Sequence, residues 1–438
     1  MEIKRNIEKQ LYKWLNSHKR KPLVLQGARQ VGKTWLLKHF GADNFENVAY
    51  FNFERQPELK QFFENTKDPK RILQNITLVN GKPILAQKTL IIFDEIQECN
   101  EALNSLKYFY EETPEYVIAC AGSLLGVAMS RGASFPVGKV DFLQIYPLTF
   151  QEFLAQADSN LHSYLEQLAV IEQIPDIFFN QLIEKLKMYY ISGGMPEAVV
   201  ALLEDNDIEK TQKALNNILN AYMLDFSKHV ENKDIPKINY IWNSLPSQLA
   251  RENNKFLYQS VKNGARARDY EQALLWLINA GLSYKVFCST KPALPLSAYD
   301  NLSAFKIYLP DVALLRVLSQ LNPSAFAEQN RLFTEFKGAL TENYILNSLV
   351  YQSETMPRYW KSGNKAEIDF LFQFKNNIIP VEVKSDVNVR SKSLSVYRKK
   401  YNPDISIRYS LKNFKYDNGV LNIPLFMVDY TFDIISKI

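Results

Sequence analysis

Short runs of apolar residues, each ending in polar or small residues, recur along the first third of the chain. They lie at 23–25, 47–55, 89–97 and 116–126. Each run has the length of a buried β-strand. A helical pattern that includes Trp35, Leu36 and Phe40 follows the first run. Strands that alternate with helices predict an α/β fold for this part of the chain.

The pattern becomes mostly helical from about residue 207. Residues 255–287 predict a helix, a break at Gly264, a second helix and then a strand. The second helix takes its apolar face from Ala273, Leu274, Trp276, Leu277 and Ile278. A later apolar run, "FKIYLPDVALL", is a candidate partner for that strand. The segment 206–324 therefore has a winged-helix-like pattern.

Two alternating segments near the carboxy-terminal end predict strands. In 365–374, Ile368 and three phenylalanines share one face, and Asp369 lies on the other. In 376–386, Glu382 and Lys384 are two residues apart, so both project from the same face. This part of the chain is therefore also predicted to be α/β.

A hairpin is predicted to join these two strands. Asparagine favours tight turns, so we expect a two-residue loop at Asn376-Asn377. That register would place Asp369 opposite Lys384. A helix at 332–351, which contains Glu342, comes before the hairpin.

Composition narrows the class of protein. A length of 438 residues suggests about three domains. Cys99, Cys120 and Cys288 have no metal-ligand spacing, and so few cysteines fit a reducing cytoplasm. The charged amino terminus lacks the apolar core of a signal peptide, and no apolar run is long enough to span a bilayer. We expect a cytoplasmic protein without a membrane segment.

The net charge of +5 is unevenly distributed. Residues 384–415 hold nine Lys and Arg against two Asp, or +7, which leaves −2 for the rest of the chain. Such a block suits a polyanion such as nucleic acid. A solvated helix face is the alternative.

The first strand leads into GARQVGKT, which opens the next helix, and this is the context that a phosphate-binding loop requires. Its glycines allow backbone N–H groups to surround phosphates at a helix N-terminus. Lys33 is expected to reach the β- and γ-phosphates of ATP, and Thr34 to hold Mg²⁺. The predicted nucleotide-binding residues are Gly27, Ala28, Arg29, Gln30, Val31, Gly32, Lys33, Thr34 and Ser123.

An acidic pair follows the apolar run 89–94. Asp94 is expected to bind Mg²⁺, directly or through water, and Glu95 to orient and deprotonate the attacking water. Ser123 ends the next strand and is expected either to contact the γ-phosphate or the water, or to cap a helix. Lys33 and Glu95 are thus the predicted catalytic residues of ATP hydrolysis.

GARQVGKT, IIFDEIQ, AGSLLG and YPLTFQEFL together resemble the prokaryotic AAA-type P-loop ATPases that carry a C-terminal domain of unknown function. The resemblance implies an ATP-binding domain over residues 1–205. In YYISGGMPEAV, Gly194 and Pro196 match a turn that lies near the nucleotide base in related signalling ATPases. Relatives often have Gly-Arg where this chain has Gly138-Lys139, and Arg131 nearby has no assigned role. Such ATPases commonly complete their site from a neighbouring subunit, which implies a homo-oligomer.

The middle segment has two interpretations. A helix-turn-helix in a DNA-binding module presents its second helix to the major groove, whereas winged helices also pack as lids on AAA-type ATPases. The candidate phosphate contacts are Arg251, Lys255, Lys262, Arg266 and Arg268.

Glu342, Asp369, Glu382 and Lys384 follow one another as in PD-(D/E)XK nucleases, which residues 325–438 resemble. The resemblance implies that Glu342, Asp369 and Glu382 bind Mg²⁺ and that Lys384 positions the water, with Glu382 and Lys384 as catalytic residues. An exposed ion pair on a strand is the plainer interpretation of Glu382 and Lys384.

The sequence as a whole predicts an ATPase that acts as a nucleotide-driven switch and engages nucleic acid through its carboxy-terminal domain. That domain is either a working metal-dependent nuclease or a binding module that has lost catalysis. In the second case the chain is a signalling or regulatory ATPase.

Overall fold

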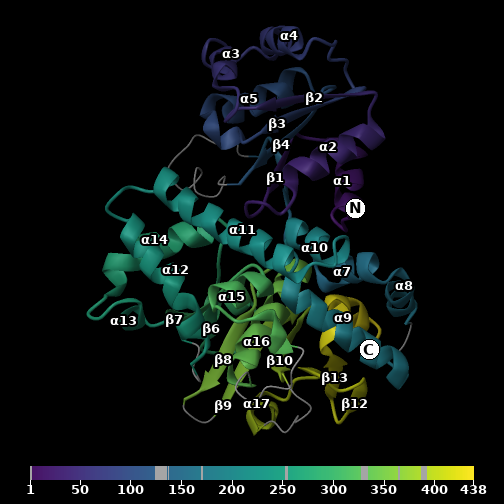
Figure 1. Ribbon diagram of the computed structural model, residues 1–438, viewed down its shortest axis with the longest axis vertical. Coiled ribbons are helices and arrows are strands. Elements are labelled where there is room, and N and C mark those ends of the chain that lie inside the picture. Colours follow the sequence, from purple (N-terminus) through teal and green to yellow (C-terminus); the bar gives the residue numbers. More distant parts are fainter. Residues whose placement is uncertain are drawn as a thin grey trace. The chain divides into compact units, whose positions relative to one another are not determined.

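The computed structural model describes residues 2–438 apart from 124–135, 137, 169–170, 252–254, 327–333, 364–365 and 386–391 (Figure 1). The chain divides into two compact units. The amino-terminal unit comprises residues 2–146 and 276–282, and the carboxy-terminal unit comprises 147–275 and 283–438. Within the described ranges, no helix combines the length and the apolar character that a bilayer crossing requires.

A five-stranded parallel sheet in the order β2-β3-β4-β1-β5 forms the centre of the amino-terminal unit. Its strands are β1 (Leu23–Gln26), β2 (Asn47–Asn52), β3 (Thr89–Asp94), β4 (Val117–Gly122) and β5 (Asp141–Gln144). Every residue of β3 and β4 is buried, as expected for strands covered on both faces. The predicted α/β fold and its first four strands are confirmed.

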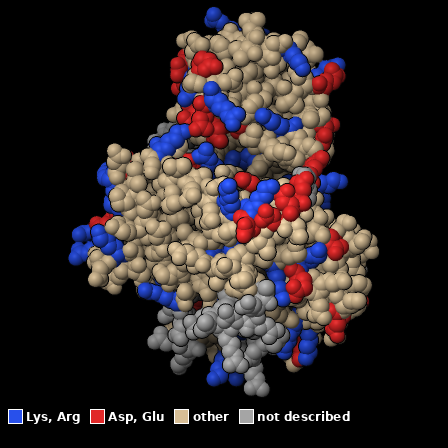
Figure 2. All heavy atoms as spheres, viewed as in Figure 1, with Lys and Arg blue, Asp and Glu red and all other residues tan. Residues whose placement is uncertain are grey.

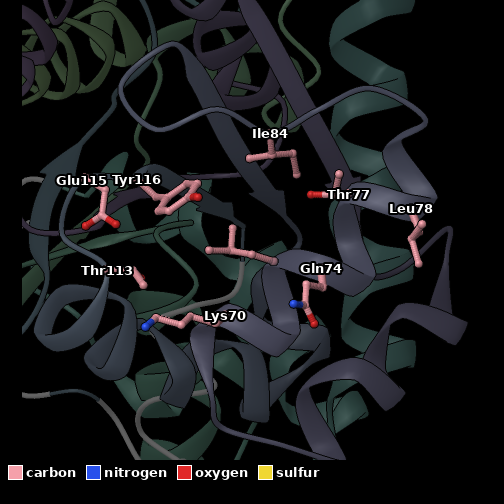
Figure 3. Close-up of a pocket in the computed structure, with 9 residues that line it drawn as sticks. Lys70, Gln74, Thr77, Leu78, Ile84, Thr113, Glu115 and Tyr116 are labelled. Atoms are coloured by element: carbon pink, nitrogen blue, oxygen red, sulfur yellow. The ribbon is translucent and has the colours of Figure 1, made fainter.

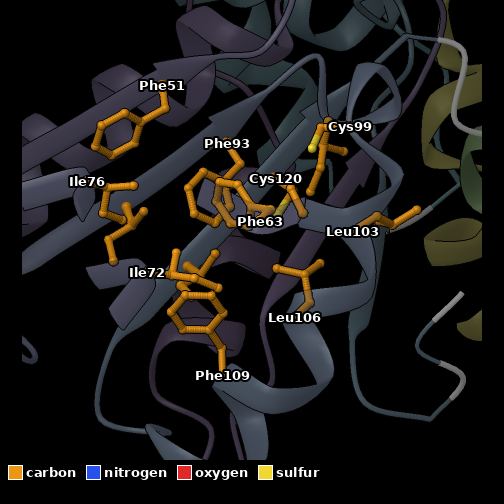
Figure 4. Close-up of a cluster of buried hydrophobic side chains, with 14 of the residues drawn as sticks. Phe51, Phe63, Ile72, Ile76, Phe93, Cys99, Leu103, Leu106, Phe109 and Cys120 are labelled. Atoms are coloured by element: carbon orange, nitrogen blue, oxygen red, sulfur yellow. The ribbon is translucent and has the colours of Figure 1, made fainter. Parts of the chain in front are cut away.

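Short helices flank this sheet. They are α1 (Glu8–Leu15), α2 (Lys33–Asn44), η1 (Pro57–Lys60), α3 (Gln61–Glu64), α4 (Pro69–Asn80), η2 (Ile96–Glu98) and α5 (Asn100–Glu112). Aromatic side chains pack between α3, α5 and the sheet (Figure 4). The rings of Phe63 and Phe93 meet edge to face, with their centroids 5.5 Å apart. The ring centroid of Phe53 lies 5.4 Å from that of Phe63. This core fixes the end of β3, which carries the predicted acidic pair.

The carboxy-terminal unit begins with helices. They are α7 (Phe150–Ala157), α8 (Ser159–Gln167), α9 (Asp176–Ser192), α10 (Pro196–Leu203), α11 (Ile208–His229), α12 (Ile235–Leu249), α13 (Tyr258–Val261) and α14 (Ala267–Asn279), whose last residues count with the amino-terminal unit. Thr149 and Glu152 form a reciprocal capping box that starts α7. The helix, break at Gly264 and second helix predicted for the middle segment are present as α13 and α14, and Gly264 has φ +79°.

An eight-stranded mixed sheet completes this unit, in the order β12-β13-β11-β10-β9-β8-β6-β7. Its strands are β6 (Tyr284–Ser289), β7 (Asp300–Tyr308), β8 (Arg358–Ser362), β9 (Ala366–Phe374), β10 (Asn377–Val383), β11 (Ser406–Ser410), β12 (Lys415–Asp417) and β13 (Val420–Pro424). Its helices are η3 (Leu296–Tyr299), α15 (Val312–Leu318), η4 (Pro323–Phe326), α16 (Thr334–Gln352), α17 (Lys392–Tyr401), η6 (Leu425–Tyr430) and α18 (Thr431–Ser436). β10 and β11 are parallel neighbours, so α17 makes the crossover between them.

The predicted strand pair of the middle segment forms, but it also joins a larger sheet. β6 and β7 pair antiparallel, and β6 runs parallel to β8 through Cys288 and Ser289 beside Tyr359 and Trp360. Two strands from the segment 206–324 therefore extend the sheet that holds β9 and β10.

The predicted register of the β9–β10 hairpin is wrong by two residues. Phe374 pairs with Asn377, so the loop is Lys375-Asn376, and Lys375 adopts φ +52°. Because side chains alternate with a period of two, this shift leaves every side chain on its predicted face. Asp369 therefore lies nearest Glu382 and Val383 and not opposite Lys384: the backbone N–H of Val383 donates to Asp369 at 2.7 Å.

Candidate functional site

The GARQVGKT motif forms the loop between β1 and α2, at the carboxyl edge of the parallel sheet. α2 begins at Lys33, and Gly32 before it has φ +94°, which favours glycine. A Cβ on Gly27 would lie 2.3 Å from the carbonyl oxygen of Ile145. Gly27 thus leaves no room for a side chain, and the loop packs closely against the residue that follows β5.

The Lys33 side chain turns back into this loop. Its Nζ donates to the carbonyl oxygens of Gly27 and Ala28, at 2.9 and 2.7 Å. Burial lowers the pKa of Lys33 to about 8, although Glu95 and Asp94 oppose this shift. An anion bound in the loop would stabilise the ammonium form, so a phosphate group is a suitable ligand here.

Asp94 ends β3 and accepts three hydrogen bonds on one carboxylate oxygen. The donors are the hydroxyls of Thr34 and Tyr50, at 3.0 and 2.7 Å, and the Asn52 amide, at 3.2 Å. The structure thus brings the predicted Thr34 and Asp94 together. Both are oxygen donors of the kind that Mg²⁺ prefers, so these residues fit the Mg²⁺ that accompanies ATP.

The sequence patterns do not single out Tyr50 and Asn52. They stand two residues apart on β2, and the parallel register places Asn52 beside Asp94. Burial, together with the Asp94 contact, raises the pKa of Tyr50 to about 12, so Tyr50 remains a hydrogen-bond donor. Two polar residues at the end of an otherwise apolar strand are the signal that could have identified them.

Glu95 accepts hydrogen bonds from two neighbouring side chains. Its Oε2 lies 2.6 Å from the Gln97 amide nitrogen and 3.3 Å from the Ser123 hydroxyl. Ser123 follows β4, so the chain brings it to the predicted general base from the adjacent strand. The alternative role of Ser123, as a helix cap, depends on residues 124–135, which lie outside the described residues, as does Arg131.

Arg5, which no motif indicates, contacts the backbone of the loop. Its guanidinium donates to the carbonyl oxygens of Val31 and Tyr146, at 3.2 and 2.7 Å. In the loop, Ala28 and Val31 are buried, Arg29 is half-buried and Gln30 is exposed. Arg5 therefore ties the middle of the loop to the segment after β5.

The predicted Gly-x-Pro turn lies in the carboxy-terminal unit, between α9 and α10. The backbone N–H of Gly194 donates to the buried carboxylate of Asp311 at 2.6 Å. A Cβ on Gly193 would lie 2.2 Å from the same carboxylate. Asp311 also caps α15 through Ala313 and Leu314. This carboxylate therefore holds the turn against α15, and the closeness of the turn to a nucleotide base stays a prediction.

The candidate phosphate contacts of the middle segment are mostly accessible. Arg251, Lys262, Arg266 and Arg268 are exposed, and Lys255 is half-buried. Figure 2 shows Lys and Arg side chains at the margin of the molecule where α12 to α14 lie. The Lys262 ammonium lies 5.2 Å from the ring of Tyr240. This surface combines positive charge with an exposed aromatic ring, and its contact with nucleic acid stays a prediction.

The predicted nuclease-like residues lie on α16, β9 and β10 and just after β10. Glu382 is buried, and its Oε1 lies 2.7 Å from the ammonium of the half-buried Lys384. The pair is therefore not an exposed decoration of the strand. Burial raises the pKa of Asp369 well above its ordinary value, and the nearby Glu342 and Glu382 raise it further.

A buried lysine that the sequence patterns do not indicate belongs to the same region. Lys306 lies on β7, and its ammonium is 2.7 Å from Glu367 and 3.6 Å from Glu342. Tyr308, two residues on, donates its hydroxyl to Glu342 at 3.1 Å. Burial alone would lower the pKa of Lys306, but Tyr308 and the neighbouring carboxyl groups raise it well above the ordinary value. A lysine inside the apolar second half of β7 is the signal that could have identified it.

Among the described residues, no group of three or more His, Cys, Asp or Glu side chains is arranged to hold a metal ion. Glu342 and Glu382 each contact a lysine, and Asp369 accepts a backbone N–H. The metal-binding roles of Glu342, Asp369 and Glu382 stay predictions.

A hollow of about 690 Å³ lies elsewhere in the amino-terminal unit (Figure 3). α4 contributes Lys70, Gln74 and Thr77, and the segment before β4 contributes Glu115 and Tyr116. It therefore lies at the amino edge of the sheet. Ligands of open parallel sheets bind at the carboxyl edge, so this hollow is separate from the nucleotide loop.

Three family descriptions match successive parts of the chain. Residues 19–154 match the AAA domain, 183–325 match a Domain of unknown function (DUF8612), and 337–427 match a Domain of unknown function (DUF4143). An uncharacterized protein of Methanocaldococcus jannaschii is 23% identical over 270 residues, which are 59% of this chain and 54% of that protein. The matched region thus spans about half the length of this relative.

Solved structures give loose overall likenesses. A Walker-type ATPase of Pyrococcus abyssi aligns over 72% of this chain and 96% of its own, with 14% identity and a TM-score of 0.46. The Thermotoga maritima RuvB Holliday junction branch migration motor aligns over 67% and 91%, with 14% identity and a TM-score of 0.29. The AAA match covers the loop, Asp94, Glu95 and Ser123 described above. The chain therefore contains an AAA-type P-loop domain, which is followed by two domains of unknown function.

Proposed function

We propose that this chain hydrolyses ATP and works as a nucleotide-driven switch. One observation carries the proposal: Lys33, Thr34, Asp94, Glu95 and Ser123 meet at the carboxyl edge of one sheet, at the start of α2. A phosphate chain placed there would face backbone N–H groups at a helix N-terminus. Thr34 and Asp94 would hold Mg²⁺, which supplies charge neutralisation at the phosphates.

Glu95 has the position expected of the residue that accepts a proton from the attacking water. Gln97 and Ser123 hydrogen-bond to its Oε2 and so restrict its orientation. A carboxylate so placed can accept the water proton while Lys33 stabilises the charge that develops on the phosphates.

Two substitutions separate these roles. Lys33→Ala should abolish ATP binding, because it removes the ammonium that faces the phosphates. Glu95→Gln should retain binding and lose turnover by at least about a hundredfold, because only the proton acceptor is lost. Calorimetry measures the binding, and phosphate release measures the turnover. An equal loss of affinity in both variants would contradict the assignment.

We also propose that the carboxy-terminal domain engages nucleic acid. Its basic block includes α17, where Lys399 and Lys400 are exposed and the Lys400 ammonium lies 5.1 Å from the ring of Tyr401. A nuclease activity is the second candidate, favoured by the buried Glu382 beside Lys384 and Asp369. The paired state of these acids supports binding without cleavage as the first choice.

Binding and cleavage are measured on the full chain with single-stranded and plasmid DNA. Lys399→Glu should weaken binding several-fold and reduce its salt dependence, because one phosphate contact is lost. Lys375→Glu, an exposed lysine in the hairpin loop of the same sheet, is the matched control and should bind normally. Cleavage with Mg²⁺ or Mn²⁺ that Asp369→Asn abolishes would establish the nuclease instead. Equal binding by both lysine variants would remove α17 from the interface.

A further inference from the structure

Lys306 is the most deeply buried lysine among the described residues. It also contacts more than one acid. Its side chain is 1% exposed, whereas lysines are almost never fully buried unless paired. Its ammonium contacts Glu367 on β9 and lies 3.6 Å from Glu342 on α16. Asp369 lies two residues after Glu367 on β9 and therefore on the same face of that strand. The ammonium thus contacts two carboxylates from two elements, and a third carboxylate projects from the same face.

The strand that carries Lys306 is fixed next to one of these acids. β7 is anchored to α16 next to Glu342, because Leu309 and Asn343 exchange two hydrogen bonds, at 2.9 and 3.1 Å. Tyr308 lies on the same face of β7 as Lys306 and donates to Glu342. These contacts hold the β7 backbone, and with it the base of the Lys306 side chain, beside α16.

The arrangement also crosses a domain boundary in sequence. Lys306 and Tyr308 lie within the matched range 183–325, whereas Glu342, Glu367 and Asp369 lie within 337–427. The acids are thus compensated by a residue from the preceding domain. A fragment that begins near residue 325 would keep the carboxylates and lose the Lys306 ammonium, and Lys361 would remain as a cation at Glu367.

We propose that the Lys306 ammonium is the resident counter-cation of Glu342, Glu367 and Asp369, and that it takes the place of a divalent metal ion in the nuclease-like domain. The proposal concerns the nuclease-like acids of the carboxy-terminal domain, and it requires neither ATP hydrolysis nor DNA binding. It predicts that a divalent metal ion changes the melting temperature of the wild type only weakly. Removing the ammonium should make the melting temperature depend on the metal ion. The oxygens of Glu342 and Glu367 that lie 3.6 and 2.7 Å from the ammonium are hard ligands of the type that Mg²⁺ and Mn²⁺ prefer.

The test uses the full chain and follows its melting temperature as MnCl₂ is added. Lys306→Met should lower the melting temperature in EDTA by roughly 10 °C, because buried carboxylates lose their partner. Mn²⁺ should then restore part of the loss by mass action on the folded state. Its midpoint concentration should be at least about tenfold lower than for the wild type.

Lys361→Met is the matched control. Lys361 contacts the other oxygen of Glu367, also at 2.7 Å, but its side chain is 22% exposed. Its removal deletes an ammonium from the same carboxylate without emptying the buried position. This variant should respond to Mn²⁺ as the wild type does.

A second variant covers the case in which Lys306→Met does not fold. Lys306→Met combined with Glu367→Gln removes one charge of each sign and retains Glu342, Asp369 and Glu382. It should fold and gain the Mn²⁺ response. A folded variant no more responsive than the wild type, or a wild type that responds at the same Mn²⁺ concentrations, would overturn the proposal. Either result leaves the ATPase and DNA-binding assays unaffected.

Discussion

Asp429 is a single buried carboxylate that joins three elements of the carboxy-terminal unit. It lies in η6, accepts a hydrogen bond from the Gln151 backbone in α7 at 2.8 Å, and accepts another from Ser348 in α16. Burial raises its pKa from 3.8 to about 6, although both hydrogen bonds oppose the shift. The folded state therefore binds this proton more tightly than the unfolded state does.

The sign of the resulting pH dependence follows from linkage. The proton on Asp429 stabilises the folded state, and this stabilisation is fully present below pH 4 and is lost as pH rises through about 6. The loss in the free energy of unfolding over this window is about 3 kcal/mol. Asp429→Asn does not titrate, so the wild type should lose several degrees of melting temperature relative to this variant between pH 4 and 7. Asp433→Asn, an exposed neighbour in α18, is the control and should follow the wild type. Parallel curves for wild type and Asp429→Asn would refute the assignment.

Individual residues differ in how far a sequence reveals them. Lys33 and Asp94 belong to motifs whose spacing carries their chemistry, and the structure places both at the nucleotide loop. Tyr50 and Lys306 each lie among apolar residues of a strand. Their partners Asp94 and Glu367 lie 44 and 61 residues further along the chain. Their roles depend on which strands become neighbours, and no local pattern contains that information.

At the scale of elements, periodicity identifies strands better than it identifies their pairing. The alternation in β9 and β10 correctly separates the two faces, but the asparagine pair suggests a loop one residue too far along the chain. The turn instead uses Lys375 in the left-handed region, where a non-glycine residue costs roughly 1 kcal/mol or more. Pairing along the whole hairpin outweighs this local cost. A shift of two residues preserves the faces, which is why Asp369 and Glu382 still lie together.

At the scale of the whole molecule, the segment between the first and last domains contributes to both compact units. Residues 276–282 count with the amino-terminal unit, whereas β6 and β7 extend the carboxy-terminal sheet. Helical and strand patterns in this segment are readable from sequence. The long-range pairing of β6 with β8, about 70 residues apart (Cys288 with Tyr359), is not, because strand order depends on tertiary packing.

Self-association is the prediction that belongs to this scale. The Arg5 guanidinium, near the nucleotide loop, is committed to the Val31 and Tyr146 carbonyls, and Arg131 lies outside the described residues. A positive group from a second copy is the expected way to complete the ATP site, so ATP should promote assembly.

Glu95→Gln should hold ATP without hydrolysing it, which would keep the assembled state populated. Light scattering should then show that the average molar mass of the Glu95→Gln variant rises with protein concentration when ATP is added. Lys33→Ala should show no such change, because it lacks the charge that faces the phosphates. A Glu95→Gln variant that binds ATP yet stays monomeric at every concentration would show that the site is complete within one chain.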